Sequence, residues 1–174
     1  MQPAQNIDIN ALKAQVDEEI AARLLIEADF ARYTQRRALR IGELKLLVPL
    51  EATSEVLEMP PLYRLPGAPT GIMGLANRHG RVVPVLDLSE FFGKRVERVA
   101  RSWLLICGRG DEAIGLVIDS LPERKSFVQD DETSLSQIQH PIKNYARKAY
   151  RAGKDIWIDI ETGEFFDKIF NVET

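Results

Sequence analysis

Apolar residues in the first part of the chain recur with the period of a helix. One row repeats at every fourth position: Leu12, Val16, Ile20 and Leu24. This spacing places the row on one side of an α-helix, and Asn10 is a suitable N-cap before it. The pattern predicts a helix from residue 10 to about residue 38. Two partners are open to this helix, the rest of the chain or a second copy of it.

The far end of this predicted helix is rich in arginine. The segment "RYTQRRALR" carries Arg32, Arg36, Arg37 and Arg40. Cations suit the carboxyl end of a helix because that end of the helix dipole is negative. The same residues fit either a solvated face or a patch for an acidic partner, and both interpretations stay open.

After Gly42 the pattern becomes that of strands. "LKLLVPL" is a short apolar run with a proline, which predicts a strand at an edge or with a bulge. Residues 58–69 contain four prolines and are predicted to cross the surface in extended conformation. Three apolar side chains are available to hold this crossing down: Leu62, Tyr63 and Leu65.

Residues 71–88, "GIMGLANRHGRVVPVLDL", predict a β-hairpin. Its strands are "GIMGLA" and "RVVPVLD", joined at Asn77-Arg78-His79-Gly80, where glycine can take the positive φ of a tight turn. "DLSEFFG" then predicts one helical turn, capped by Asp87 or Ser89 and ended by Gly93.

The second half repeats this organisation. "SWLLIC" and "AIGLVIDSL" predict strands around the turn "GRGDE", and residues 126–154 mix short helical and loop signals. "DIWIDI" predicts a strand with three residues on one face: Ile156, Ile158 and Ile160. "GEFFDKIFNV" predicts a closing helix that docks through Phe166, Ile169 and Phe170. Many short strands indicate an all-β barrel architecture framed by terminal helices.

Composition narrows the class of protein. The 174 residues, 45% hydrophobic and 28% charged, suit one globular domain or two small packed ones. A net charge of −3 disfavours nucleic acid as the main partner, since phosphate binding needs a basic field. We find no apolar run long enough to cross a membrane and no secretory signal, so a soluble cytoplasmic protein is expected.

Motifs for catalysis, metal binding and cofactor binding are missing from the sequence. There is no phosphate-binding glycine loop, and His79 and His140 lie far apart with no Cys or His beside either one. Cys107 lies inside "WLLIC", which predicts a small core residue rather than a nucleophile. We therefore expect no enzyme, no metal and no cofactor, with a Cys107 hydrolase as the remote alternative.

The stretch "SEVLEMPPLYRLPGAPTGIMGLANRHGRVVPVLDLSEFFG" resembles the CheW family of chemotaxis coupling proteins. In that family a glutamate on a strand precedes a proline-containing crossing, a "GxxNLRGxxVPVxDL" hairpin and a short helix. The later "IGLVIDSL" is similar to the family's "GLxVDxV" strand. Minimal members of the family lack the N-terminal helix, and the closing "DIWIDIETGEFFDKIF" is similar to the tail of the PilI-type adaptors of type IV pilus chemosensory systems.

The resemblance implies a mainly β fold of two small five-stranded, SH3-like β-barrels packed on a hydrophobic seam. It gives residues 1–40 as an N-terminal helical extension and residues 41–171 as the CheW-like domain. The implied function is a non-enzymatic adaptor that binds the regulatory domain of a CheA-type histidine kinase and the cytoplasmic tip of a chemoreceptor. Such an adaptor would be recruited to receptor arrays at the inner membrane. The alternative is a scaffold of pilus or envelope machinery without kinase coupling.

The resemblance also implies partner-binding residues. Matched position by position, they are Thr53, Glu55, Gly74 and His79, with Asn77, Arg78 and Gly80 completing the hairpin tip. One departure stands out, because the family's "NLRG" is "NRHG" here. His79 stands at the family's arginine position and cannot grip a carboxylate with two prongs as a guanidinium does. Either Arg78 takes over that contact, or the receptor partner differs.

Overall fold

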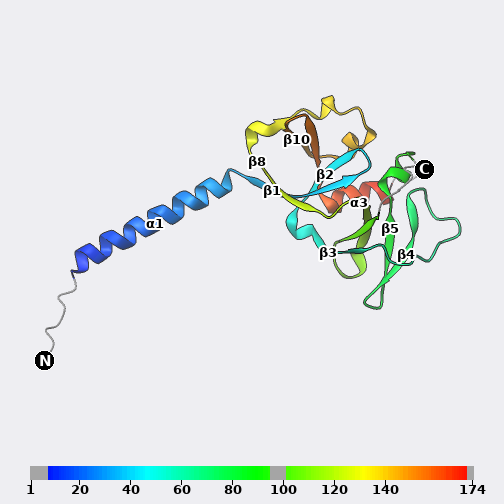
Figure 1. Ribbon diagram of the computed structural model, residues 1–174, viewed down its shortest axis with the longest axis horizontal. Helices are drawn as coiled ribbons and strands as arrows, with labels where there is room; N and C mark the ends of the chain where they lie inside the picture. The colour runs from blue at the N-terminus through cyan, green and yellow to red at the C-terminus, as the bar shows by residue number, and fades with distance from the viewer. Residues whose placement is uncertain (1–7, 95–100, 172–174) are drawn as a thin grey trace. The chain divides into compact units, whose positions relative to one another are not determined.

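The computed structural model describes residues 8–94 and 101–171 (Figure 1). Contacts divide the chain after Thr34 into two compact units. The first contains one long helix, and the second, from Gln35 onward, contains the strands and the remaining helices. The second unit therefore begins N-terminal to the predicted domain start at residue 41.

The helix of the first unit, α1, spans Ile9–Ala31. It begins where the Asp8 carboxylate accepts hydrogen bonds from the backbone N–H of Asn10 (3.0 Å) and Ala11 (3.3 Å). The predicted helix is confirmed, but its N-cap is Asp8 rather than Asn10, and its predicted end near residue 38 is wrong. None of its residues is buried.

The arginine-rich segment forms strand β1, Thr34–Ile41, and does not continue the helix. It pairs with β2, Leu44–Val48, through the tight turn that contains Gly42. Arg36 Nε donates to Asp159 Oδ1 at 2.9 Å, and the guanidinium of Arg40 lies 5.2 Å from the centre of the Trp157 ring. Arg32 caps α1, but Arg36, Arg37 and Arg40 lie on a strand and not on the predicted helix, because strand pairing in the folded chain outweighs a modest helix propensity.

The first sheet has six strands in the order β8-β1-β2-β11-β10-β9. Its later strands are β8 (Glu123–Phe127), β9 (Glu132–Thr133), β10 (Lys148–Ala152) and β11 (Asp155–Asp159). The predicted strand "DIWIDI" is confirmed as β11, whereas β10 lies in the region read as helical and loop signals. β2 is an interior strand and Pro49 follows its last residue, so the expected edge or bulge in this strand is wrong.

The second sheet has five strands in the order β3-β6-β7-β5-β4. These strands are β3 (Thr53–Glu58), β4 (Ile72–Arg78), β5 (Arg81–Leu86), β6 (Trp103–Cys107) and β7 (Ile114–Ile118). Both predicted hairpins are confirmed, since β4 pairs with β5 and β6 pairs with β7, each antiparallel.

Short helices join or close the sheets. The single turn α2 spans Leu88–Phe91, and the Asp87 carboxylate caps it by accepting from Ser89 N at 2.9 Å, as predicted. The closing helix α3 spans Thr162–Phe170. It buries Phe166 and Ile169 as expected, together with Phe165, while Phe170 stays 43% exposed. Short 3₁₀ helices lie at Leu50–Ala52, Gly110–Glu112, Gln129–Asp131, Leu135–Gln137 and Pro141–Tyr145.

The main core lies between the two sheets. It joins Leu39 and Leu46 of the first sheet to Leu86 and Leu105 of the second, and Phe165 of α3 packs into it. Burial of these side chains from both sheets supplies the main force that holds the subdomains together. The structure thus confirms a mainly β fold of two subdomains with flanking helices, although one sheet has six strands and not five.

Candidate functional site

The hairpin between β4 and β5 carries most of the residues that the sequence singled out. Arg78 pairs with Arg81, so the turn consists of only His79 and Gly80. Both have positive φ, 53° for His79 and 77° for Gly80, as a type I′ turn requires. The expected positive φ at Gly80 is confirmed, and the same turn geometry lifts the His79 side chain to 74% exposure.

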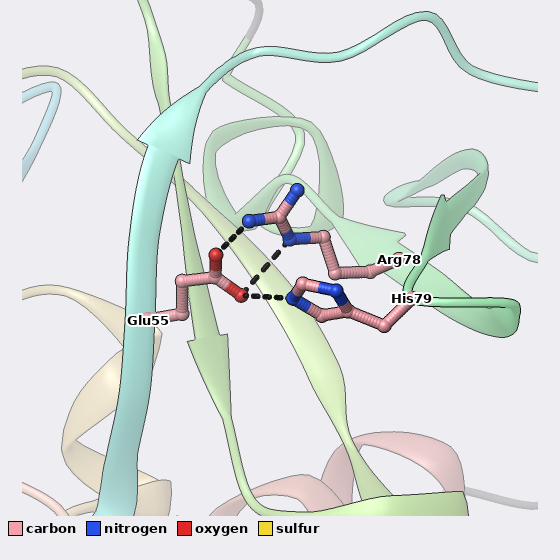
Figure 2. Close-up of polar contacts among 3 residues, drawn as sticks. All are labelled: Glu55, Arg78 and His79. Atoms are coloured by element: carbon pink, nitrogen blue, oxygen red, sulfur yellow. Dashed lines mark hydrogen bonds and ion pairs between the residues drawn. The ribbon is translucent and has the colours of Figure 1, made fainter.

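Three side chains meet beside this turn (Figure 2). Arg78 Nε donates to Glu55 Oε2 at 2.9 Å, and Arg78 Nη2 donates to Glu55 Oε1. His79 Nε2 lies 3.7 Å from the same Oε2. Arg78 therefore makes a two-pronged contact with the carboxylate, and His79 adds a contact that becomes an ion pair only when the imidazole is protonated.

The contact between Glu55 and Arg78 favours the charged form of both side chains. The hydrogen bond from Arg78 lowers the pKa of Glu55 below its usual value, against a smaller opposing effect of burial. The same bond raises the pKa of Arg78. Glu55 thus stays ionised at neutral pH and half-buried, with its two oxygens engaged within the chain.

Glu55 and Arg78 come from opposite ends of one sheet. Glu55 lies on β3 and Arg78 on β4, the first and last strands in the order of the five-stranded sheet. A contact between the two outer strands requires the sheet to curl toward a barrel. The cluster therefore lies where the rolled sheet brings its edges together.

A hollow of about 540 Å³ adjoins the cluster. Besides Glu55, Arg78 and His79, it is lined by Arg81 and Arg109 and by the apolar Val83 and Ile106. Arg81 Nη1 also lies 3.3 Å from Asp111 Oδ1. Arg81 and Arg109 are not among the predicted site residues, although the two-residue turn itself places Arg81 opposite Arg78.

Gly74 lies beneath the proline-rich crossing. Tyr63 and Leu75 exchange two backbone hydrogen bonds of 2.8 Å, which tie the crossing to β4. A Cβ at Gly74 would lie 2.4 Å from the Tyr63 carbonyl oxygen, and the residue has φ +149°. Backbone packing thus requires glycine here, and its contact with a partner stays a prediction.

Of the three apolar side chains expected to anchor the crossing, only Leu62 packs on the core. Leu62 packs against the smaller core of the second sheet, but the side chains of Tyr63 and Leu65 are 74% and 43% exposed. A second hollow, of about 840 Å³, lies along the crossing and is lined by Leu62, Leu65 and Met73 among others. The second sheet thus presents two hollows, one at the hairpin tip and one at the crossing.

Two other predicted site residues lie outside the charged cluster. Thr53 begins β3, and its hydroxyl donates to the Leu50 carbonyl oxygen at 3.3 Å. Asn77 is exposed on β4 opposite Val82, which is itself 65% exposed. Among the seven predicted positions, Glu55, Arg78 and His79 are the ones whose side chains meet.

Cys107 and His140 lie in surroundings that give them structural roles. Burial in the main core raises the pKa of the Cys107 thiol to about 12, which disfavours the hydrolase alternative. His140 caps a 3₁₀ helix, since its Nδ1 accepts from Ile142 N at 3.0 Å, and burial lowers its pKa. Within residues 8–94 and 101–171 no cluster of three or more His, Cys, Asp or Glu side chains is suited to a metal. In the same ranges, no helix has the length and apolarity that a membrane crossing needs.

The amino-acid sequence is similar to those of two known proteins. The chain is 36% identical to FrzA of Myxococcus xanthus over 106 residues, which cover 60% of this chain and 62% of FrzA. It is 30% identical to PilI of Pseudomonas aeruginosa over 92 residues, 52% of each protein. The matches thus span between half and two thirds of these relatives.

A solved structure shares the fold. The crystal structure of the scaffolding protein TtCheW from Thermoanaerobacter tengcongensis superposes with a TM-score of 0.68 at 18% sequence identity. The likeness covers 80% of this chain and 88% of that one. In addition, residues 38–167 match the family model of the CheW-like domain. The chain therefore belongs to the CheW-like domain family.

Proposed function

We propose that this protein is a non-enzymatic adaptor that couples a chemoreceptor to a CheA-type histidine kinase in a chemosensory system. The observation that carries this proposal is the cluster of Glu55, Arg78 and His79 at an exposed hairpin tip, within a domain of the CheW-like family. A rigid β framework with a charged tip beside an apolar hollow suits docking of a helical segment, with polar contacts fixing its register.

The two hollows of the second sheet support an adaptor with more than one partner. The hollow at the hairpin tip combines arginines with Val83 and Ile106, and the hollow at the crossing includes Leu65 and Met73. A bridging protein needs separate surfaces that can be occupied at the same time. Thr53, Asn77 and Gly80 are proposed as further partner contacts around the tip.

Binding of purified partners tests the proposal. Full-length protein, a receptor-tip fragment and a kinase regulatory domain from the same genome should form a ternary complex in calorimetry and co-sedimentation. Arg78→Ala should weaken binding of one partner by roughly tenfold, as expected when an arginine at a contact is lost. Failure of the protein to bind either fragment would refute the coupling function and favour a pilus or envelope scaffold.

Arg147 offers a matched control for the Arg78 variant. It also makes a two-pronged contact with a glutamate, with Nη2 2.9 Å from Glu164 Oε1 and Nε 3.3 Å from Glu164 Oε2. Arg147 lies just before β10 of the first sheet, whereas the hairpin tip belongs to the second sheet. Arg147→Ala should therefore leave partner binding unchanged.

The finer proposal is a place in a type IV pilus system that controls twitching motility. Its support is the 30% identity to PilI, whereas FrzA matches at higher identity over a longer segment. Deletion of the gene should abolish twitching, and a fluorescent fusion should collect at membrane receptor arrays. Normal twitching in the deletion strain would assign the protein to another chemosensory system.

A further inference from the structure

The helix α1 carries exposed apolar residues along its length, and a row of them is called the seam of α1 below. None of its residues, Ile9–Ala31, is buried. Eight large apolar side chains of α1 are between 47% and 72% exposed, and five of them form the seam: Ile9, Leu12, Val16, Ile26 and Phe30. A helix about 35 Å long with such a seam gains stability by packing it against a partner.

These residues follow a heptad repeat. With Ile9 as position a, the a positions are Ile9, Val16, Arg23 and Phe30, and the d positions are Leu12, Glu19 and Ile26. Alternating intervals of three and four residues are the pattern of a two-stranded coiled coil. The pattern is interrupted only at its centre, where Glu19 and Arg23 take the place of apolar residues.

The two charged positions select the orientation of the partner. In a parallel pair of identical helices, Glu19 would face Glu19 and Arg23 would face Arg23, so like charges would meet inside the seam. In an antiparallel pair, each a position faces a d position of the other copy. Glu19 then faces Arg23, twice, at the centre of the dimer, while Leu12 meets Phe30 and Val16 meets Ile26. Charged or polar residues in a coiled-coil seam act in this way to fix orientation and register.

The flanking positions show the same complementarity. The e positions of α1 are Lys13, Ile20 and Glu27. In the antiparallel register Lys13 lies beside Glu27 of the other copy, and Ile20 lies beside its own equivalent. Opposite charges at these flanks stabilise the pairing that brings them together. Leu24 and Leu25 lie outside the seam.

We propose that α1 pairs with α1 of a second copy of this chain in an antiparallel coiled coil. The inference is independent of the proposed coupling function. Joined in this way, the chain would be a dimer with two copies of every binding surface, and a pair of receptors or kinases would be held with higher avidity than by one copy.

Sedimentation equilibrium of the full-length chain tests this proposal. The expected mass is twice the 19.7 kDa of one chain. Glu19→Arg and Arg23→Glu should each weaken dimerisation by roughly tenfold or more, because each places like charges in the seam. The double variant Glu19→Arg/Arg23→Glu should restore the dimer. Glu18→Arg, the same charge change outside the seam, should have no effect.

Disulfide trapping tests the orientation. A mixture of the Val16→Cys and Ile26→Cys chains should form a mixed disulfide on oxidation, and neither variant should cross-link to itself. The native Cys107 is buried and does not compete. Circular dichroism should show the same helix content in Glu18→Arg and in the double variant as in the parent chain.

Three results would each overturn the proposal. These are a monomer at a chain concentration of about 100 µM, a dimer that neither Glu19→Arg nor Glu18→Arg weakens, or self-cross-linking of Val16→Cys. A monomer would leave the seam to the rest of the chain or to a different protein.

Discussion

The guanidinium of Arg78 donates two hydrogen bonds to the carboxylate of Glu55, which lies on the opposite edge strand of the same sheet. The contact joins β4 to β3, the outer strands of the five-stranded sheet, and His79 approaches the same carboxylate. Where the family's pattern has arginine, this chain has His79, yet a two-pronged arginine contact is present and comes from Arg78. The departure from the family pattern thus leaves a guanidinium at the tip, one residue earlier.

The Glu55–Arg78 contact predicts a lowered titration midpoint for Glu55. Carbon-detected NMR titration should place its pKa below the ordinary value of 4.5, and Arg78→Ala should raise it. Since the folded-state pKa is the lower one, ionised Glu55 stabilises the fold above pH 4.5. That contribution is lost as the pH falls through the lowered pKa. Arg147→Ala is the control and should leave the Glu55 midpoint unchanged.

Gly74 should tolerate no side chain. Gly74→Ala should lower the free energy of unfolding by about 2–3 kcal/mol, because the new methyl group meets the Tyr63 carbonyl and the backbone has positive φ. Gly153→Ala is the control, with φ +62° and no atom within 4 Å of an added Cβ. It should cost only about 1 kcal/mol in urea unfolding. Equal losses for the two variants would contradict close packing under the crossing.

The type I′ turn predicts an order of tolerance at Gly80. An added Cβ meets open space there, so only the backbone conformation matters. Gly80→Asn should be nearly neutral and Gly80→Val should cost about 1–2 kcal/mol, since a β-branched residue resists positive φ. Thermal melts of the two variants measure this difference. Indistinguishable melting temperatures would argue against the turn.

Cys107 should be inert in the native protein. With a pKa of about 12 and 1% exposure, on the order of one thiol in 10⁵ is ionised at pH 7. Labelling by a disulfide reagent should therefore require unfolding and should accelerate in urea. Rapid labelling of the native chain would revive the nucleophile hypothesis.

Local patterns predicted most of the strands and the hairpin tip. The apolar run in "RVVPVLD" and the turn chemistry of His79-Gly80 are both encoded within a few residues, so β4, β5 and their turn could be predicted directly. Two errors have a common cause. β1 and β10 were missed because charged residues interrupt their apolar pattern, although each pairs with the next strand along the chain, β1 with β2 and β10 with β11.

The candidate site was predictable only in part. The resemblance pointed to Glu55 and His79, but pairing of Glu55 with Arg78 depends on how the sheet rolls, which no short pattern states. The surrounding Arg109 and Ile106 come from a different hairpin and join the hollow only in the folded protein. Gly74 was assigned to a partner contact, whereas its conformation and close approach to Tyr63 give it a structural reason to be glycine.

The pairing of β2 with β11 has a consequence for synthesis of the chain. Leu46 of β2 pairs with Ile158 of β11, so the first sheet cannot be completed until β11 has been synthesised. All strands of the second sheet lie between Thr53 and Ile118, and they can assemble while translation continues. Until β11 has been synthesised, the edge of β2 opposite β1 lacks its strand partner, and an unpaired strand edge favours aggregation.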